Sequence, residues 1–256
     1  MLKKRLIFVL FFMEGNFYLS RNFVLQKVGD TNWLIDKFKF SCIGDYIDEL
    51  IIYDVTRDRN SARDLILLEE SLKKLMSQLF LPLTIGGGIK TIEQAASCFK
   101  IGADKIALNT TLVSEVDFVK ECVRRYGSQA VLASVDTKRS SEGYVSFIRN
   151  GEREHLSLTD HISAIVQLNV GEICINSIDQ DGTGTGLDLD LLEVIPKIPM
   201  PLIISGGAGK PEHFAAALRI DSVSAVATGN LFNFIGSGFS DARVYLSSHL
   251  SNVRQL

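Results

Sequence analysis

Two pairs of adjacent glycines stand where a phosphate group could be bound. Gly87-Gly88 and Gly206-Gly207 each follow a short apolar run of the kind that forms a buried strand. Glycine leaves the backbone N–H groups bare, so phosphate oxygens can approach them closely. One pair lies in the first half of the chain and the other in the second half, so together they could hold a ligand with a phosphate at each end. Tight turns alone would also explain the glycines. The candidate phosphate-binding residues are Gly87, Gly88, Asn109, Thr110, Asp181, Gly182, Gly206, Gly207, Gly229 and Asn230.

The glycine pairs belong to a longer internal repeat. Residues 85–110 parallel residues 204–229, and each segment has the pattern of a strand ending in glycines, a helix and a second strand. Residues 53–58 likewise parallel residues 178–183. The repeat is weak in identity but specific in where its glycines and acids fall. It predicts two similar halves, roughly residues 1–125 and 126–256.

The same offset places Phe11 opposite Asp136, at the ends of the first strands of the two halves. General acid–base catalysis often uses two carboxylates, one as the acid and one as the base. Here one half ends its first strand in a carboxylate, and the other ends it in an aromatic ring that cannot transfer a proton. Asp136 is therefore the candidate catalytic residue, and its expected carboxylate partner is absent.

Apolar, β-branched runs alternate with helical patterns along the chain. The predicted strands are residues 6–12, 49–54, 83–86, 105–109, 130–136, 172–177, 202–205 and 224–228. The clearest helical period covers residues 62–80, and Ser114 is a good N-cap for a helix that ends at Gly127. Eight strands alternating with helices predict a parallel sheet with right-handed crossovers. At 256 residues, its natural form is a single α/β domain over residues 1–256, a closed (β/α)8 TIM barrel.

Composition excludes several classes of function. A formal net charge of −3 gives no reason to expect a nucleic-acid partner. The cysteines lie far apart with no CxxC pair, which predicts buried thiols in a reducing, cytoplasmic compartment. The histidines do not cluster along the chain, so we expect no metal site, and nothing points to a cofactor. The cysteines are Cys42, Cys98, Cys122 and Cys174, and the histidines are His155, His161, His213 and His249.

The opening run RLIFVLFFMEG, residues 5–15, admits two interpretations. Basic residues precede its apolar part, as in a secretion signal, but Glu14 and Gly15 follow at once and no small-x-small cleavage site appears. The run is also too short to cross a bilayer, which needs ~20 residues, so we expect no membrane association. We predict a strand that is buried on both faces, as in a parallel sheet.

Six segments resemble the cyclase subunit of imidazole glycerol phosphate synthase, the HisF family, over essentially the whole chain. They are MLKKR, DELIIYDVT, IGGGI, GADKIALNT, SIDQDGTGTG and ISGGAGKPEHF. The resemblance implies a (β/α)8 barrel of histidine biosynthesis that forms a heterodimer with a glutaminase subunit and receives ammonia through the barrel. Of the family's two catalytic aspartates, Asp136 matches the second. Phe11 takes the place of the first, and Leu19 takes the place of a family lysine.

The resemblance also implies a gate for ammonia at the bottom of the barrel. The matching charged residues are Arg5, Glu49, Lys105 and Glu172. Side-chain parity agrees, because Arg5 and Phe11 fall on one face of a strand whose period is two. A solvated ring of salt bridges would also explain the charges, but inward-facing charges need pairing, and two of each sign supply it. Asp104 matches a family residue that faces the glutaminase.

Three functions remain open at this point, each with a phosphorylated small molecule as the expected ligand. The first function follows from the missing aspartate, by which the chain resembles barrels encoded with surface-polysaccharide genes. That resemblance implies that the barrel passes ammonia from a glutaminase to an ATP-dependent amidotransferase, which turns a sugar acetamido group into an acetamidino group. The second function is the cyclase (lyase) of histidine biosynthesis, which would need Glu14 or another acid to replace the carboxylate. The third is a non-catalytic phosphate-binding scaffold that activates the glutaminase.

Overall fold

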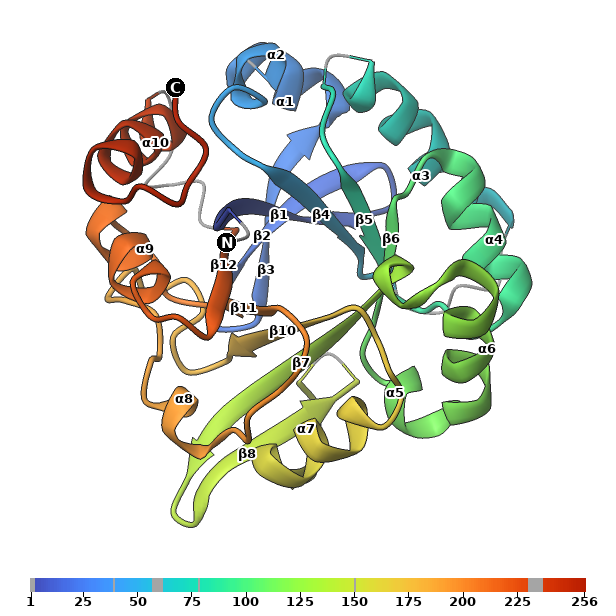
Figure 1. Ribbon diagram of the computed structural model, residues 1–256. Helices are drawn as coiled ribbons and strands as arrows, with labels where there is room; N and C mark the ends of the chain where they lie inside the picture. Colours follow the sequence, from blue (N-terminus) through green and yellow to red (C-terminus); the bar gives the residue numbers. More distant parts are fainter. Residues whose placement is uncertain (1–2, 39, 57–61, 78, 150, 230–236) are drawn as a thin grey trace.

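Eight parallel strands close a ring in the part of the chain that the structure describes, residues 3–38, 40–56, 62–77, 79–149, 151–229 and 237–256 of a computed structural model (Figure 1). Each strand pairs in parallel with the next, and the pairing of β10 with β7 completes the circle. The ring strands are β1 (Arg5–Met13), β4 (Glu49–Asp54), β5 (Leu83–Gly86), β6 (Lys105–Leu108), β7 (Val131–Ser140), β10 (Glu172–Ser177), β11 (Leu202–Ser205) and β12 (Val223–Thr228). The predicted closed (β/α)8 barrel is confirmed.

The helices surround the ring on its outer side (Figure 1). They are α1 (Thr31–Phe38), α2 (Phe40–Ile43), α3 (Ala62–Met76), α4 (Ile92–Ile101), α5 (Thr111–Ser114), α6 (Val116–Tyr126), the 3-10 turn η1 (Ser128–Ala130), α7 (Leu158–Val166), α8 (Leu191–Val194), α9 (Pro211–Leu218) and α10 (Gly238–His249). None of the helices in the described residues is long and apolar enough to cross a membrane.

Two local helix predictions need correction, and one boundary is confirmed. The helix predicted over residues 62–80 ends at Met76. Ser114 is not an N-cap, because it closes the short helix α5, and α6 begins after Glu115 without a side-chain cap. Gly127 does end α6, with a positive φ of 88° that suits glycine. An N-cap residue needs an extended backbone, but Ser114 is the last residue of the helical turn Thr111–Ser114, so it cannot cap α6.

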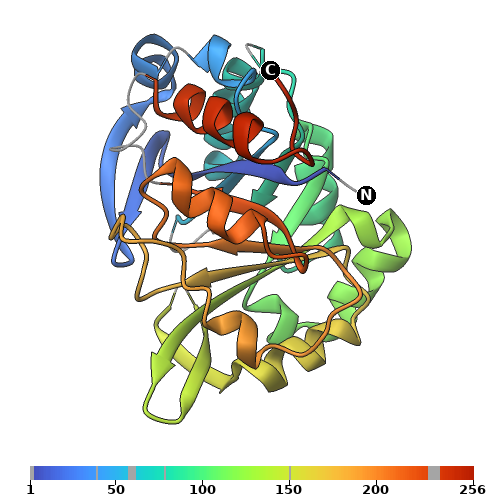
Figure 2. The same cartoon turned by 60° about the vertical axis from the view of Figure 1, so that its left-hand side comes forward.

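Two antiparallel hairpins extend the ring at one end. After β1 the chain forms β2 (Asn16–Arg21) and β3 (Val24–Asp30), and after β7 it forms β8 (Gly143–Ile148) and β9 (Arg153–Ser157). Figure 2 shows both hairpins on the left of the view, away from the N-terminus. The two longest ring strands, β1 and β7, are each followed by a hairpin. The division into residues 1–125 and 126–256 stays a prediction.

The alternation of side chains along β1 separates two hydrophobic clusters. Leu6, Phe8, Leu10 and Phe12 are buried against the helices, whereas Ile7 and Val9 are buried inside the ring. This is the period of two of an extended strand, with both faces covered. The run RLIFVLFFMEG is thus the first barrel strand, continuing into the β1–β2 turn, as predicted.

Candidate functional site

Four strands bring four charged side chains together at the lower end of the lumen. Arg5 of β1 pairs with Glu49 of β4 and, at 2.8 Å, with Glu172 of β10. Lys105 of β6 pairs with the same two glutamates at 3.1 Å and 3.0 Å. The four side chains are only 9% to 20% exposed, so this floor ring is a closed circuit of nearly buried ion pairs. The structure assembles the four residues that the sequence analysis grouped, and their role as an ammonia gate stays a prediction.

The floor ring also sets the protonation of its arginine. Burial lowers the pKa of the Arg5 guanidinium, but the charges and hydrogen bonds of Glu49 and Glu172 outweigh it and raise the pKa above its ordinary value. Just outside the ring, Asp104 is exposed and its carboxylate accepts a hydrogen bond of 2.8 Å from the backbone N–H of Leu83. The predicted contact of Asp104 with a glutaminase stays a prediction.

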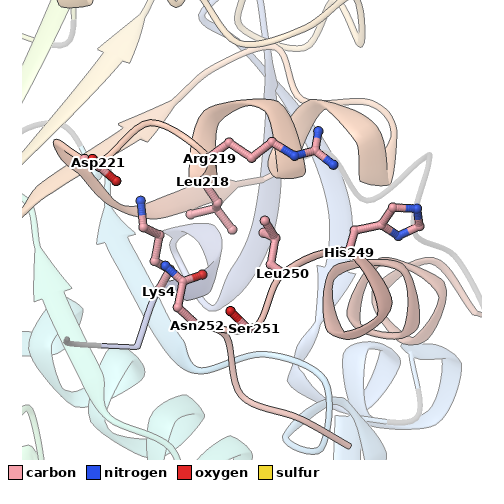
Figure 3. Close-up of a pocket in the computed structure, with 8 residues that line it drawn as sticks. All are labelled: Lys4, Leu218, Arg219, Asp221, His249, Leu250, Ser251 and Asn252. Atoms are coloured by element: carbon pink, nitrogen blue, oxygen red, sulfur yellow. The ribbon is translucent and has the colours of Figure 1, made fainter.

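A shallow pocket of about 320 Å³ lies beside the floor of the barrel, near the ends of α9 and α10 (Figure 3). Lys4 lines it and donates a hydrogen bond of 2.6 Å to the carbonyl of Ile220. Burial lowers the pKa of the Lys4 ammonium, partly offset by the nearby charge of Asp221. The pocket contains none of the four floor-ring residues and not Asp136, so it is separate from the lumen.

Above the floor ring, the lumen is lined by apolar and small side chains. They are Ile7, Val9, Ile51, Ala107, Leu132, Cys174, Ile203, Ala225 and Ala227. Burial, more than any nearby charge, raises the pKa of the Cys174 thiol to about 12, so the thiol is neutral at physiological pH. Such a lining offers no charge to bind an ion, and it suits the passage of a small neutral molecule.

Asp136 lies at the upper end of the lumen, within β7. Its carboxylate accepts hydrogen bonds from the side-chain amides of Asn109, at 3.0 Å, and of Asn176, at 3.2 Å. Burial raises the pKa of Asp136 to about 6, and the charge of Asp181 adds to the rise, while the two asparagine amides oppose it. A carboxyl group with this pKa can both accept and donate a proton near neutral pH, which is what a general acid–base residue needs.

Phe11 occupies the matching place on β1, and its aromatic side chain cannot share proton transfer with Asp136. Its ring stacks on Tyr53, with centroids 5.9 Å apart and planes 25° from parallel. Leu19, where the family has a lysine, is buried in the outer hydrophobic core. Glu14 is exposed in the β1–β2 turn, where its φ of 50° is unusual for a residue other than glycine.

Tyr53 is a lumen residue that the sequence alone did not single out. Its hydroxyl hydrogen-bonds the Ser134 hydroxyl at 3.1 Å, which joins β4 to β7 across the lumen. Burial raises the pKa of the Tyr53 phenol well above its ordinary value, and the charge of Asp136 adds to the rise, so the phenol stays protonated. Side-chain parity could have indicated it, because Tyr53 follows Glu49 by four residues on the same face of β4.

The two glycine pairs lie directly after β5 and β11, on the side of the ring where Asp136 lies. All four glycines have positive φ angles between 59° and 101°, a conformation that favours glycine. A side chain at Gly206 would meet the carbonyl oxygen of Ser177 at 2.6 Å, and Gly207 accepts a backbone hydrogen bond of 2.8 Å from Gly186. These contacts explain the glycines as turn and packing residues. Their binding of phosphate stays a prediction.

Asp181 and Gly182 contact the β2–β3 hairpin. The Asp181 carboxylate accepts hydrogen bonds from the Ser20 hydroxyl, at 2.5 Å, and from the Phe23 backbone N–H, at 2.9 Å. A side chain at Gly182 would meet the Cα of Arg21 at 2.6 Å. The Asp181 carboxylate thus fixes the β2–β3 hairpin to the loop after β10. Binding of phosphate by Asp181 and Gly182 stays a prediction.

The remaining predicted phosphate residues lie near the upper end of the ring. The Thr110 hydroxyl accepts a hydrogen bond of 3.0 Å from the Arg149 backbone N–H. A side chain at Gly229 would lie 3.2 Å from the carbonyl oxygen of Val9 and 3.7 Å from the Phe11 ring, so glycine there makes room for the aromatic side chain. Asn230 lies outside the described residues.

The prediction that all four cysteines are buried is wrong in part. Cys98, Cys122 and Cys174 are buried as predicted, but Cys42 is exposed. His155 and His161 do meet, with ring centroids 5.0 Å apart. They come from β9 and α7, and this contact is not visible in their spacing. Within the described residues, no three histidine, cysteine, aspartate or glutamate side chains converge in a way that could hold a metal ion.

Comparison with known proteins gives a consistent set of similarities. Residues 40–236 match the family described as "Histidine biosynthesis protein". The "Putative imidazole glycerol phosphate synthase subunit hisF2" of Parasynechococcus marenigrum (strain WH8102) is 40% identical over 251 residues, covering 97% of this chain and 92% of that protein. "Imidazole glycerol phosphate synthase subunit HisF" of Alkaliphilus metalliredigens (strain QYMF) is 34% identical over 91% of this chain and 92% of that protein. The "Imidazole glycerol phosphate synthase subunit HisF" of Thermotoga sp. (strain RQ2) is 33% identical over 99% of this chain and 98% of that protein.

Proposed function

The chain belongs to the histidine biosynthesis protein family, as a member of its HisF branch of imidazole glycerol phosphate synthase subunits, and from this membership we propose that it is an ammonia-conducting subunit of a glutamine amidotransferase complex. The observation that carries the proposal is the contrast within one lumen. The floor ring is complete, whereas Phe11 stands where the paired carboxylate of an acid–base catalyst would be.

The proposal assigns the lumen to a neutral molecule. Ammonia that a glutaminase partner releases at the floor enters through the ring of Arg5, Glu49, Lys105 and Glu172. Above the ring, the apolar lining neither binds the molecule strongly nor favours its protonation, because an ammonium ion would lose its hydration there without a partner. The same lining excludes charged solutes, so the lumen selects for the neutral form.

For the destination of the ammonia, we propose a sugar whose acetamido group becomes an acetamidino group on an ATP-dependent amidotransferase. The support is the resemblance of the altered mouth to barrels encoded with surface-polysaccharide genes. In this assignment Asp136 and the glycine turns bind a phosphorylated ligand or the partner enzyme, and the barrel carries out no ring closure of its own.

The second candidate is the cyclase reaction of histidine biosynthesis, and a specific observation favours it. Asp136, with a pKa of about 6 and two asparagine donors, keeps the environment of a working general acid–base group. The relatives named above also carry cyclase-complex names. Against it, Glu14 lies exposed in the turn beyond β1 and does not take the place of the missing carboxylate.

An assay with excess ammonium salt separates the two candidates, because it requires no glutaminase. The ribulosyl aminoimidazole carboxamide substrate of the cyclase is supplied, and its loss is followed for the unaltered protein, Phe11→Asp and Asp136→Asn. We expect no turnover by the unaltered protein and partial gain by Phe11→Asp, since one general acid–base group typically contributes roughly 10²–10⁴-fold. Turnover by the unaltered protein at an ordinary enzymatic rate, abolished in Asp136→Asn, would instead establish the cyclase.

A second assay separates conduction from a scaffold role. In the complex with its glutaminase, nitrogen transfer from glutamine is compared with transfer from ammonium salt for Lys105→Met and for the matched surface change Lys120→Met. Conduction predicts that only Lys105→Met loses glutamine-dependent transfer while ammonium-dependent transfer is kept. Equal behaviour of the two variants would favour the scaffold.

A further inference from the structure

Tyr53 spans the lumen between strands that are not neighbours. It lies on β4, and the Ser134 hydroxyl that its own hydroxyl meets at 3.1 Å lies on β7, with β5 and β6 between them in the ring. The phenol therefore crosses the barrel as a bar fixed at both ends, covalently at β4 and through a hydrogen bond at β7.

The neighbouring strands leave room for this bar. A side chain at Gly86 of β5 would meet the Tyr53 ring at 2.6 Å, so only glycine fits beneath the ring. Ala107 of β6 is the small residue next to Gly86. From the other side, Phe11 stacks on the ring and confines it. Five strands thus contribute to one arrangement, which makes the bar a built feature of the lumen.

The position of the bar along the lumen defines what it separates. On β4, Tyr53 follows Glu49 of the floor ring by four residues on the same face, and on β7 Ser134 precedes Asp136 by two residues on the same face. The hydrogen bond between Tyr53 and Ser134 consequently lies above the floor ring and below Asp136. A molecule that moves from the floor to the mouth has to pass it.

We propose that Tyr53 and Ser134 form a second gate in the lumen, a hydrogen-bonded bar held by Phe11, which opens when the Tyr53 hydroxyl releases Ser134 and admits only a small neutral molecule to the side of Asp136. This inference deepens the proposed function and rests on it for the identity of the molecule as ammonia. The closure itself is a property of this chain alone.

Cys174 provides a probe of the closure. It is buried in the lumen, and it pairs with Ser134 in the register of β10 and β7. Methyl methanethiosulfonate, a small neutral reagent that modifies thiols, is added to the whole protein, and peptide mass spectrometry follows each cysteine separately. Cys98 and Cys122, buried in the outer core, report any general unfolding in the same sample.

Three variants test the bar. Tyr53→Leu removes it, Tyr53→Phe removes only the hydroxyl, and Tyr126→Leu makes the first change on the outer helix α6 as a matched control. We expect modification of Cys174 to be more than about tenfold faster in Tyr53→Leu. In Tyr53→Phe it should be about fivefold faster, the change in the opening equilibrium that follows from losing one net hydrogen bond. Tyr126→Leu should leave the rate at Cys174 unchanged. An unchanged Cys174 rate in Tyr53→Leu, or an equal acceleration at Cys98 and Cys122, would overturn the gate.

The outcome is independent of ammonia conduction. If Cys174 becomes reactive in Tyr53→Leu but Lys105→Met keeps its glutamine-dependent nitrogen transfer, the bar closes the lumen and the proposed function fails. If Lys105→Met loses that transfer and Cys174 stays unreactive in Tyr53→Leu, conduction stands and the gate fails. If both hold, Tyr53→Leu in the complex should release more free ammonia per glutamine hydrolysed than the unaltered protein.

Discussion

The two ends of the lumen differ in how their polar groups are satisfied. At the floor, two cations and two anions from four strands pair with one another in a closed circuit. At the mouth, Asp136 is held by two asparagines on one side, while Phe11 and Tyr53 stack on the other. The floor is internally complete, and the mouth is half polar and half aromatic. The proposed function assigns conduction to the floor and the lining, and this end is the more complete of the two.

The difference has a physical origin in how each end tolerates substitution. Removing any member of the floor ring leaves a nearly buried charge without its partner, which is expensive. At the mouth, replacing a carboxylate by Phe11 removes a charge, and the loss can be offset by packing against Tyr53. The mouth can thus change its chemistry while the barrel stays folded.

The largest expected effect tests the completeness of the floor. Arg5→Met leaves two glutamates facing one lysine, and the loss of one partner of a buried ion pair costs about 3–5 kcal/mol. We expect the free energy of unfolding in urea to fall by about 3 kcal/mol. Adding Glu172→Gln to Arg5→Met rebalances the charge and should recover part of the loss. A fall below about 1 kcal/mol, the value of an exposed pair, would mean that the ring is effectively solvated.

The next effect concerns the mouth and depends on pH. The folded pKa of Asp136, about 6, lies above its ordinary value of 3.8, so the folded state binds this proton more tightly than the unfolded state does. Stability contributed by this group is therefore present below pH 4 and lost as pH rises from 4 to 6. Asp136→Asn should be more stable than the unaltered protein by about 3 kcal/mol at pH 7, and the difference should nearly vanish near pH 4.

Urea unfolding of both proteins between pH 4 and 8 measures this difference in the free energy of unfolding. The contributions of all other titrating groups are the same in both proteins and cancel. The asparagine in Asp136→Asn can be accommodated by Asn109. The Asn109 side-chain oxygen has no hydrogen-bond partner among the described residues, so after the amide turns it can accept from the new N–H group. A stability difference that does not change with pH would show that the pKa of Asp136 is ordinary.

The floor was more predictable from the sequence than the mouth. The bounds of β4, β5, β10 and β11 agree with the prediction, because strands buried on both faces are continuously apolar. The charges of the floor ring were grouped from the family resemblance, and side-chain parity along β1, β6 and β10 agrees with that grouping. The hairpins were not predicted as strands, since β3 and β9 are largely exposed and lack an apolar alternation.

The mouth depends on contacts between segments far apart in the chain. The role of Asp181 is set by Ser20 and Phe23, more than 150 residues away, and no local pattern indicates that pairing. The contact of Tyr53 with Ser134 is similarly long-range, although parity alone could have placed Tyr53 inside the barrel. Local patterns thus predict the barrel wall, and tertiary structure decides which side chains meet in its opening.

A smaller effect tests how the mouth is held together. Asp181→Ala removes the acceptor for Ser20 and Phe23, and hydrogen bonds to a charged group contribute about 1.5–3 kcal/mol each before solvent replaces them. Because Asp181 is only partly buried, we expect a loss of about 1–2 kcal/mol, with faster amide hydrogen exchange in β2 and β3. Exchange in β4 and β10, which form the floor, should be unchanged. Faster exchange in all four strands would mean that the two ends are not independent.

The smallest effect tests whether the aromatic half of the mouth is a specific pair or only filled space. Stacked aromatic rings contribute about 0.5–1.5 kcal/mol beyond their buried area. In a double-mutant cycle of Phe11→Leu and Tyr53→Leu, measured by urea unfolding, we expect a coupling of about 1 kcal/mol, since the two rings are in direct contact. Leucine at each position keeps an apolar side chain, so the coupling isolates the stack. A coupling near zero would make Phe11 a simple filler of the vacated carboxylate position. A positive coupling would mean that the residue replacing the carboxylate also fixes the bar across the lumen, so that the loss of one function at the mouth and the gain of a second closure are one structural change.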